Sequence, residues 1–368
     1  MNSILTGGGT TILANSPAAT YSGNSLRDFQ KFATKHKDKL LIGYFSYDLA
    51  YQLYNIPQTA IDDLQIPQIH FQAYDHWQTD VTLPTPTNIP HHSTNFQPTI
   101  TKEQYDAAYR KIQHHIREGD IYQINLTHRL EATSNLPPEE LFYRTIAQNP
   151  VEFGAYINTP DFQIISASPE RFIRIKDRQI ETCPVKGTRP RGKTPEKDAQ
   201  QKKSLIESEK EAAELNMITD LLRNDLGKIA KTGTVKVEGH RLISECPTVW
   251  HTYSRITAQL ATTPLEALIS MSPGGSITGC PKKRAIEIID ELEPTTRSVY
   301  TGTIGYIAPQ DRTHNLPSDL DFNIAIRTII KKGQKLYLQV GGGIVLDSTS
   351  ESEYEETLHK AASFMNIL

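Results

Sequence analysis

The sequence predicts an α+β fold, and three observations support this class. Strand-like segments come in clusters, such as residues 172–175 followed by residues 179–182, and they do not alternate one for one with helices. Regular alternation would instead indicate a doubly wound parallel sheet. Helices are indicated elsewhere by apolar residues spaced three and four apart, which form one buried stripe on each helix. The chain also lacks internal repeats, which excludes a repeat architecture.

The first hundred residues predict a short N-terminal region. Residues 1–75 are typical of mixed strands with one helix, and Gly43–Leu49 has the composition of a buried strand. Residues 76–100 are rich in Pro, Thr, Asn and His with little periodicity, which predicts a long loop. We therefore expect a shortened N-terminal region over residues 1–100, packed on a catalytic core formed by residues 101–368.

The core begins with a clear helix signal. Thr101–Gln104 fits a capping box, apolar residues follow at helical spacing, and Gly119 ends the helix. Residues 120–130 then predict a strand, and residues 194–226 predict one long helix. Further along the chain, we expect strands at residues 234–243, 302–308, 321–330 and 335–346, and helices at residues 264–270, 281–291 and 351–366.

Composition excludes several classes of protein. The chain has 368 residues, of which 38% are hydrophobic, and this is ample for a large core. Its net charge of −3, without a basic stripe, argues against nucleic-acid binding. No run is apolar enough to span a membrane, and the first residues do not resemble a secretory signal. Three scattered cysteines, each followed by proline, indicate a reducing cytoplasm without a disulfide framework or zinc site.

Lys186 is the first candidate for catalysis. Pro184 disfavours helix for the residue before it, and Gly187 lets the chain turn directly after the lysine. A lysine held in this way becomes a nucleophile at neutral pH if its amine is desolvated or lies beside other cations. The alternative is a solvated turn lysine, since most lysines are surface charges.

Two pairs of carboxylates indicate a metal site. Glu211 and Glu214 lie three residues apart on the predicted long helix, and Glu353 and Glu356 have the same spacing near the start of the last helix. Together they supply the hard oxygen ligands that Mg²⁺ prefers. The alternatives are a solvated helix face for the first pair, and for the second a helix dipole complement after a cap at Ser348 or Ser350.

A glycine turn over residues 272–283 leads into the next helix and predicts an anion site. Gly274 and Gly279 have the spacing of a phosphate-binding loop, but Cys280 replaces the lysine which that motif needs. A carboxylate therefore fits the free N–H groups better than a nucleotide. Arg327 is a cation in an otherwise apolar predicted strand, which indicates either carboxylate binding or a structural ion pair.

Taken together, these segments resemble the chorismate-utilising enzymes over residues 102–366. The resemblance rests on the motifs at residues 119–126, 168–172, 182–192, 220–227, 272–283 and 341–348. It implies an α+β fold with large, mostly antiparallel sheets packed in the centre and helices outside. It also implies a chorismate substrate and a Mg²⁺ cofactor.

The resemblance assigns a role to individual positions. It implies that Glu214 and Glu356 bind Mg²⁺, with Glu211 and Glu353 beside them. It implies that Glu170 is a general acid and that His251 is an active-site histidine. Substrate-binding positions implied by the family are Gly275, Ser276, Thr278, Gly279, Tyr300, Arg327, Gly342 and Lys360.

Two positions separate the branches of the family. Isochorismate and salicylate synthases carry a lysine where this chain has Gln123, and that lysine activates water, so ammonia is the expected nucleophile here. Anthranilate synthases usually have a small residue where this chain has Lys186. The segment around Lys186 resembles aminodeoxychorismate synthase component I, which serves p-aminobenzoate and folate synthesis. The resemblance then implies that Lys186 adds to chorismate and is displaced by ammonia.

Ammonia is expected from a separate glutamine amidotransferase subunit, because no cysteine of this chain lies in a glutaminase motif. Two other functions stay open at this point. Anthranilate synthase component I is the first alternative, and a non-catalytic scaffold that binds chorismate or an amidotransferase is the second.

Overall fold

The computed structural model describes residues 2–246, 249–311 and 314–368. Contacts divide the chain into two units. Unit 1 contains Met1–Pro169, Ser272–Pro317 and Ile324–Leu368, and unit 2 contains Glu170–Met271 and Ser318–Asn323. The boundary expected at residue 100 falls inside unit 1, where strands from both sides of it pair with each other.

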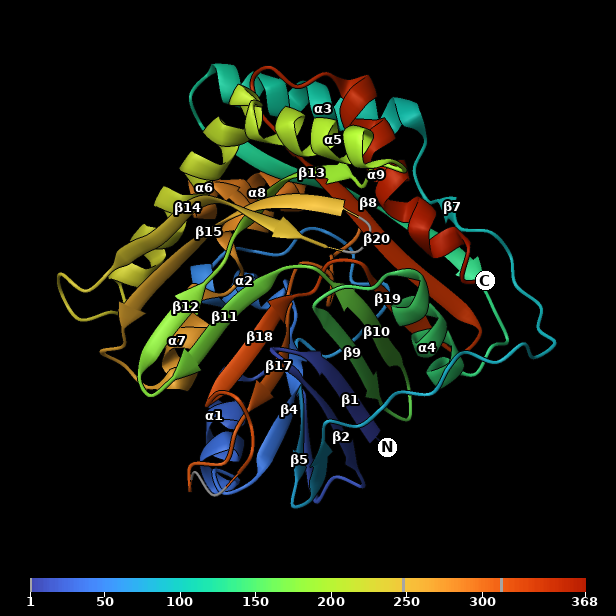
Figure 1. Cartoon of the computed structure of the whole chain (residues 1–368), viewed down its shortest axis with the longest axis vertical. Coiled ribbons are helices and arrows are strands. Elements are labelled where there is room, and N and C mark those ends of the chain that lie inside the picture. The colour runs from blue at the N-terminus through green and yellow to red at the C-terminus, as the bar shows by residue number, and fades with distance from the viewer. Residues whose placement is uncertain (1, 247–248, 312–313) are drawn as a thin grey trace. The chain divides into compact units, whose positions relative to one another are not determined.

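A ten-stranded antiparallel sheet lies wholly within unit 1 (Figure 1). Its order is β16-β8-β20-β19-β10-β9-β1-β2-β6, with β7 beside β8. The strands are β1 (Asn2–Gly7), β2 (Thr10–Asn15), β6 (Trp77–Thr79), β7 (Gln97–Pro98), β8 (Gln123–Thr133), β9 (Phe153–Asn158), β10 (Gln163–Ser168), β16 (Gly279–Cys280), β19 (Thr328–Lys332) and β20 (Lys335–Ile344).

Both faces of this sheet are buried. On one face, Leu5 and Ile164 belong to a core cluster with Ile42 and Ile304 of a second set of antiparallel strands. That set follows the order β17-β4-β5-β3, with β3 (Ala19–Gly23), β4 (Leu40–Phe45), β5 (Ile69–Tyr74) and β17 (Thr303–Ile307). The other face is covered by α4 and α9. Helices of unit 1 are α1 (Leu26–Lys35), α2 (Leu49–Tyr54), α3 (Lys102–Arg117), α4 (Pro138–Gln148), α8 (Lys282–Leu292) and α9 (Ser350–Met365).

Within the residues that the structure describes, unit 2 is built from antiparallel strands and three helices. The strands follow the order β13-β15-β12-β11-β18, and β14 pairs with β15. They are β11 (Arg171–Lys176), β12 (Gln179–Thr182), β13 (Val185–Pro190), β14 (Lys236–Glu245), β15 (Val249–Gln259) and β18 (Leu320–Ile324). The helices are α5 (Pro195–Ile206), α6 (Glu209–Gly227) and α7 (Pro264–Met271). Antiparallel sheets with separate helices confirm the predicted α+β class.

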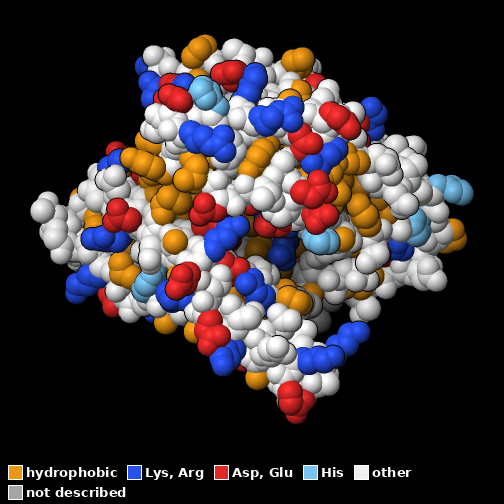
Figure 2. All heavy atoms as spheres, turned by 90° about the horizontal axis from the view of Figure 1, so that it is seen from above, with side chains coloured by type: hydrophobic (Ala, Val, Ile, Leu, Met, Phe, Trp, Pro, Cys, Tyr) orange, Lys and Arg blue, Asp and Glu red, His pale blue; other side chains and the backbone are white. Residues whose placement is uncertain are grey.

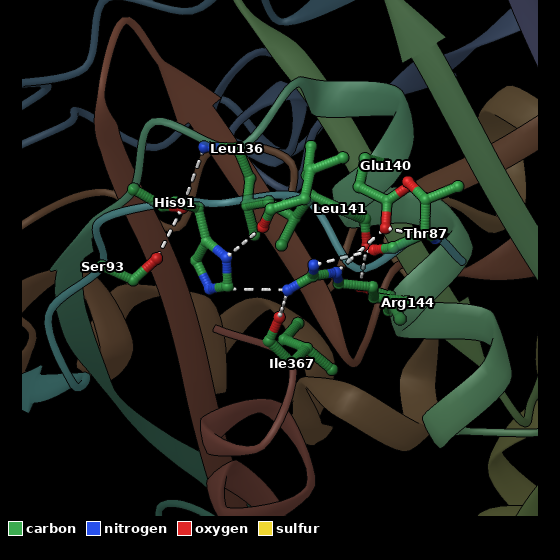
Figure 3. A network of polar contacts seen from close by, with 11 residues as sticks. Thr87, His91, Ser93, Leu136, Glu140, Leu141, Arg144 and Ile367 are labelled. Carbon is green, nitrogen blue, oxygen red and sulfur yellow. Dashed lines mark hydrogen bonds and ion pairs between the residues drawn. The ribbon is translucent and has the colours of Figure 1, made fainter.

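The predicted loop over residues 76–100 is largely confirmed, with short strands only at its two ends. It is tied to α4 through Glu140 and Arg144. Glu140 accepts hydrogen bonds from the backbone and side chain of Thr87, and Arg144 donates to the Thr87 carbonyl at 3.0 Å (Figure 3). Arg144 also contacts His91 at 3.5 Å, so the loop is held along the helix by polar contacts.

The helix after Thr101 is confirmed, with the capping box made by Thr101 and Gln104. The prediction of one helix over residues 194–226 was wrong, because α5 ends at Ile206 and a second helix, α6, begins at Glu209. The Ser208 hydroxyl caps a new helix, α6, by accepting the backbone N–H of Glu211. The apolar stripe continues across this break, so periodicity alone could not reveal it.

Two other predicted elements end early. The strand predicted over residues 321–330 is two strands, β18 and β19, because Arg327 between them has a positive φ of 51°. The strand predicted at Gly43–Leu49 ends at Phe45, and Leu49 begins α2. The last helix is capped by Thr349, and not by Ser348 or Ser350. No helix in the described ranges has the length and apolar character needed to span a membrane.

Charges of both signs are mixed on the face shown in Figure 2. Lys and Arg side chains alternate there with Asp and Glu side chains, and no stripe of one sign crosses that face. Such a mixed surface gives no electrostatic footprint for a polyanion on this side of the molecule.

Candidate active site

Lys186 lies on β13 of unit 2, where the strand is bulged. The pairing with β15 shifts by one residue between Lys186, opposite Thr252, and Thr188, opposite His251. Gly187 is the extra residue, and its φ of 78° lies in the left-handed region that glycine adopts at low cost. The Thr252 hydroxyl donates to the Lys186 carbonyl. The backbone that carries this half-buried lysine is therefore held on the side of β15.

His251 contacts the same bulge from β15. Its Nδ1 lies 2.9 Å from the Thr188 hydroxyl and 3.3 Å from the Gly187 carbonyl. A carbonyl only accepts hydrogen bonds, so Nδ1 carries the proton in this contact and Nε2 is the basic nitrogen. Glu170 lies one residue before β11 and is buried in a polar environment. Unit 2 thus brings Lys186 and His251 together at one bulge. The sequence alone could not show this proximity.

The first carboxylate pair lies on α6, next to this bulge. Arg189 Nη1 donates to Glu211 Oε1 at 2.6 Å. The other oxygen, Oε2, is buried and accepts no hydrogen bond from the described residues. A Cβ added at Gly187 would lie only 2.2 Å from Oε2, so a larger residue would displace the Glu211 carboxylate in addition to straining the backbone. Glu214, three residues further on the same helix, is half-buried.

The second carboxylate pair lies on α9 of unit 1. Glu353 is 3% exposed, and its Oε1 accepts a hydrogen bond from Ser348 at 2.7 Å. A Cβ added at Gly342 of β20 would lie 3.1 Å from its Oε2. Glu356 is exposed and pairs with Lys360 at 2.7 Å, while Lys360 also donates to a β20 carbonyl at 2.9 Å. The predicted residues Gly342, Glu353, Glu356 and Lys360 therefore lie together in unit 1.

The glycine turn lies against β8. Thr278 is buried, its hydroxyl donates to the Gly274 carbonyl at 2.7 Å, and its carbonyl accepts the N–H of Asn125 at 2.9 Å. Gly279 has a φ of 152°, and a Cβ there would lie 2.4 Å from the Gln123 carbonyl. Gln123 is itself buried, and its Oε1 accepts no hydrogen bond within the described residues. Gly275 and Ser276 lie in a single 3₁₀ turn before Thr278.

Tyr300 is buried in unit 1 behind a charged pair that sequence reasoning missed. Its N–H donates to the Arg297 carbonyl at 3.1 Å, and burial raises the pKa of its hydroxyl. Arg297 makes hydrogen bonds of 2.9 and 2.7 Å to Glu293, and its guanidinium lies 4.5 Å from the centre of the Tyr47 ring. The pair was missed because Glu293 lies just after the end of α8 and Arg297 lies in the irregular segment that follows, so no helical spacing links them in the sequence.

Arg327 differs from its expected setting. It lies outside any strand, in a left-handed conformation between β18 and β19, and its carbonyl accepts the N–H of Ala167 at 3.0 Å. Its side chain is half-buried and has polar partners, so the cation is not isolated in an apolar strand.

The residues predicted to hold Mg²⁺ fit a hard cation in two respects. The buried Oε2 of Glu211 lacks a donor among the described residues, and glycines face the outer oxygens of both Glu211 and Glu353. Within the described parts of the chain, no three His, Cys, Asp or Glu side chains are gathered closely enough to hold a metal ion. The four carboxylates are divided two and two between the units, so the Mg²⁺ assignment stays a prediction.

Comparison with known proteins identifies the family to which the chain belongs. The sequence profile described as "chorismate binding enzyme" matches residues 5–366. Aminodeoxychorismate synthase component 1 of Bacillus subtilis (strain 168) is 36% identical over 366 residues, covering 89% of this chain and 76% of that protein. Anthranilate synthase component 1 of Acetivibrio thermocellus is 34% identical over 374 residues, with shares of 89% and 74%.

Solved structures agree with this. The crystal structure of anthranilate synthase component I from Streptococcus pneumoniae TIGR4 superposes with a TM-score of 0.85 at 28% identity, covering 97% of this chain and 92% of that chain. The menaquinone-specific isochorismate synthase MenF of Escherichia coli has a TM-score of 0.80 at 17% identity, with shares of 100% and 88%, and shows the fold alone.

Proposed function

The chain belongs to the family of chorismate-binding enzymes, and from this premise we propose that it is an aminodeoxychorismate synthase component 1. Its reaction would convert chorismate and ammonia to 4-amino-4-deoxychorismate, a precursor for p-aminobenzoate and folate. That the chain is an enzyme acting on chorismate follows from the family. The choice of product is the proposal, because relatives named anthranilate synthase are nearly as similar.

The placement of Lys186 carries this proposal. The lysine lies two residues after the buried Pro184, its carbonyl accepts a hydrogen bond from Thr252, and it lies in the same bulge that His251 contacts. In the proposed reaction, the Lys186 amine forms a bond to C2 of chorismate while the hydroxyl at C4 leaves. Glu170 donates a proton to that leaving group, which departs as water. Ammonia then forms a bond to C4, and the lysine amine leaves from C2. Covalent catalysis divides one difficult displacement into two easier ones.

We further propose that Glu214 and Glu356 bind Mg²⁺, with Glu211 and Glu353 beside them. The ion would bind and polarise a carboxylate of the substrate. The buried oxygen of Glu211 that accepts no hydrogen bond from the described residues supports this assignment, because an ionised carboxylate oxygen favours a hard cation. The remaining substrate contacts are assigned to Gly275, Ser276, Thr278, Gly279, Tyr300, Arg327, Gly342 and Lys360.

Ammonia is the proposed second substrate, supplied by a glutamine amidotransferase subunit. The relatives named "component 1" support the existence of such a second component. Gln123 is buried beside the glycine turn, so no lysine is available at this position to activate water.

Lys186→Ala tests the proposal. Incubated with chorismate, Mg²⁺ and ammonium, the natural protein should form aminodeoxychorismate, identified by mass, and no fluorescent anthranilate. The variant should lose most of this activity, by about 10²-fold or more, since the covalent route is closed. Lys176→Ala, on strand β11 of the same unit, is the matched control and should keep this activity.

Three outcomes would contradict the proposal in different ways. Fluorescent anthranilate as the product would establish the first alternative, which the anthranilate synthase relatives favour. Unchanged turnover in Lys186→Ala would remove the nucleophile role. No turnover with free ammonium would favour a binding scaffold.

A further inference from the structure

Arg189 has a feature that the proposed reaction does not use. It lies on β13, three residues after Lys186, and contacts three parts of unit 2. Its Nη1 donates to Glu211 Oε1 at 2.6 Å and to the Thr188 carbonyl at 2.9 Å, and its Nε donates to the Ser204 hydroxyl at 3.1 Å. Contacts with β13, α5 and α6 fix the guanidinium in one orientation. An arginine held so firmly can in turn orient the carboxylate that it contacts.

The carboxylate of Glu211 is correspondingly asymmetric. Oε1 is bound by Arg189, whereas Oε2 is buried and accepts no hydrogen bond from any described residue. Leaving an ionised oxygen buried in this way is unfavourable unless a cation or water occupies it. The space on that side exists only because Gly187 has no side chain, since a Cβ there would lie 2.2 Å from Oε2.

We propose that Arg189 is a positioning residue, which holds Oε1 of Glu211 so that Oε2 is presented to a hard divalent cation or to a water bound to it. The inference rests on the proposed function, in which Glu211 lies beside Mg²⁺. In this proposal Arg189 acts through its contact with Glu211 and is neither a metal ligand nor a substrate contact. Its effect is to restrict the carboxylate to one orientation before the cation arrives.

Two physical effects of Arg189 oppose each other, and this makes the inference testable. Orienting Glu211 favours metal binding, because less side-chain freedom is lost when the ion binds. The positive charge of Arg189 disfavours metal binding, because it repels a second cation nearby and partly neutralises Glu211. If orientation dominates, removal of Arg189 weakens metal binding. If repulsion dominates, removal strengthens it.

The test uses the full chain and Mn²⁺ as the probe, with free Mn²⁺ counted by electron paramagnetic resonance. Arg189→Met should weaken Mn²⁺ binding by about 10–100-fold, the usual effect of removing a group that orients a metal ligand. The Mn²⁺ affinity of Arg189→Lys should lie between those of the natural protein and Arg189→Met, since a lysine can still donate a hydrogen bond to Glu211 but lacks the planar fork.

Arg174→Met is the matched control. Arg174 lies in the same unit, has a side chain 32% exposed against 28% for Arg189, and pairs with Glu181 at 3.0 Å. Its removal should leave Mn²⁺ affinity within about twofold, because Glu181 is not among the proposed ligands. A fall in affinity that both variants share would reflect general destabilisation and would overturn the inference.

Equal or tighter Mn²⁺ binding by Arg189→Met also overturns it, as does a natural protein that binds no Mn²⁺. Should Arg189→Met fail to fold in thermal unfolding, Arg189→Lys decides the question, because it also loses the planar fork that holds Oε1. Unchanged Mn²⁺ affinity in that variant would overturn the inference. Chorismate turnover by the natural protein is measured separately, so a failure of the proposed function is recognised independently of the metal-binding results.

Discussion

The two carboxylates that begin the predicted metal-binding pairs, one in each unit, are built alike and held by different donors. In unit 2, Glu211 receives a charged hydrogen bond at Oε1 from Arg189, and Gly187 makes room for Oε2. In both cases the carboxylate lies in the first turn of a helix, and a second glutamate follows three residues later.

In unit 1, Ser348 supplies a neutral donor. Ser348 donates to Oε1 of Glu353 at 2.7 Å, and Gly342 lies on the side of Oε2. Ser348 also accepts the N–H of Val345 at 3.1 Å, so one hydroxyl fixes both the loop before α9 and the carboxylate.

The two units thus hold a carboxylate in a similar arrangement, but the arrangement should respond differently to substitution of its donor and its glycine. A hydroxyl orients Glu353 without neutralising it, whereas the guanidinium orients Glu211 and compensates its charge. The glycines differ too. Gly187 has a positive φ, and a Cβ added there would lie 2.2 Å from Oε2 of Glu211. Gly342 has no positive φ, and a Cβ added there would lie 3.1 Å from Oε2 of Glu353.

Replacing each glycine by alanine should give the largest difference between the two units in the free energy of unfolding. Gly187→Ala should lower the free energy of unfolding by about 3 kcal/mol, through backbone strain and overpacking together. Gly342→Ala should lower it by about 1 kcal/mol or less, because a shift of a few tenths of an ångström relieves its contact. Urea denaturation of both variants measures the difference. Equal losses would show that the two glycines have the same role.

Removing the two donors should produce a smaller contrast. Ser348→Ala should lower the free energy of unfolding by about 2 kcal/mol, because Glu353 is 3% exposed and loses the hydrogen bond from Ser348 in a buried setting. Arg189→Met should lower it by about 1 kcal/mol or less, since this ion pair is partly exposed. Thermal unfolding, converted to free energies, gives both values.

Ser352→Ala is the control for Ser348→Ala. Ser352 lies on the exposed first turn of the same helix, and its hydroxyl contacts only Thr349 among the described residues. Its loss should stay within about 0.5 kcal/mol. A larger loss for Arg189→Met than for Ser348→Ala would reverse the comparison between the charged and neutral donors.

Local signals predicted much of this fold but not the contacts that orient the carboxylates. The capping box at Thr101 and the helix that follows were read directly, because donor and acceptor lie three residues apart. The break at Ser208 was missed because the apolar stripe runs through it. Arg327 was misplaced for a similar reason, since apolar neighbours on both sides hid the reversal of its backbone.

The side chains that donate hydrogen bonds to Glu211 and Glu353 could not be predicted from the sequence. Arg189 lies on a strand 22 residues before Glu211, and only tertiary structure brings them together. Gly187 was predicted from its turn chemistry, and its φ of 78° confirms that. Its second role, as the space beside a carboxylate oxygen, depends on where α6 packs.

Asp48 in unit 1 is a third carboxyl group, to be compared with Glu211 and Glu353, in which one oxygen accepts a hydrogen bond. Its Oδ2 accepts the N–H of Ser298 at 3.0 Å, and its Oδ1 is buried with no hydrogen-bond partner among the described residues. Burial, with the nearby charge of Asp62, raises the pKa of Asp48 to about 8. Because this pKa lies above the unfolded value of about 4, the folded state binds the proton more tightly.

Stability from Asp48 is therefore fully present below about pH 4 and is lost as the pH rises toward 8. Between these limits, the free energy of unfolding should fall by up to about 1.4 kcal/mol per pH unit from this group. Asp48→Asn should remove this part of the slope in urea denaturation across pH 5–8. Asp62→Asn should lower the pKa of Asp48 and move the upper end of the fall to lower pH, because a repelling charge is gone. An unchanged slope in Asp48→Asn would show that Asp48 is already ionised in the folded protein across this pH range, and would contradict the prediction.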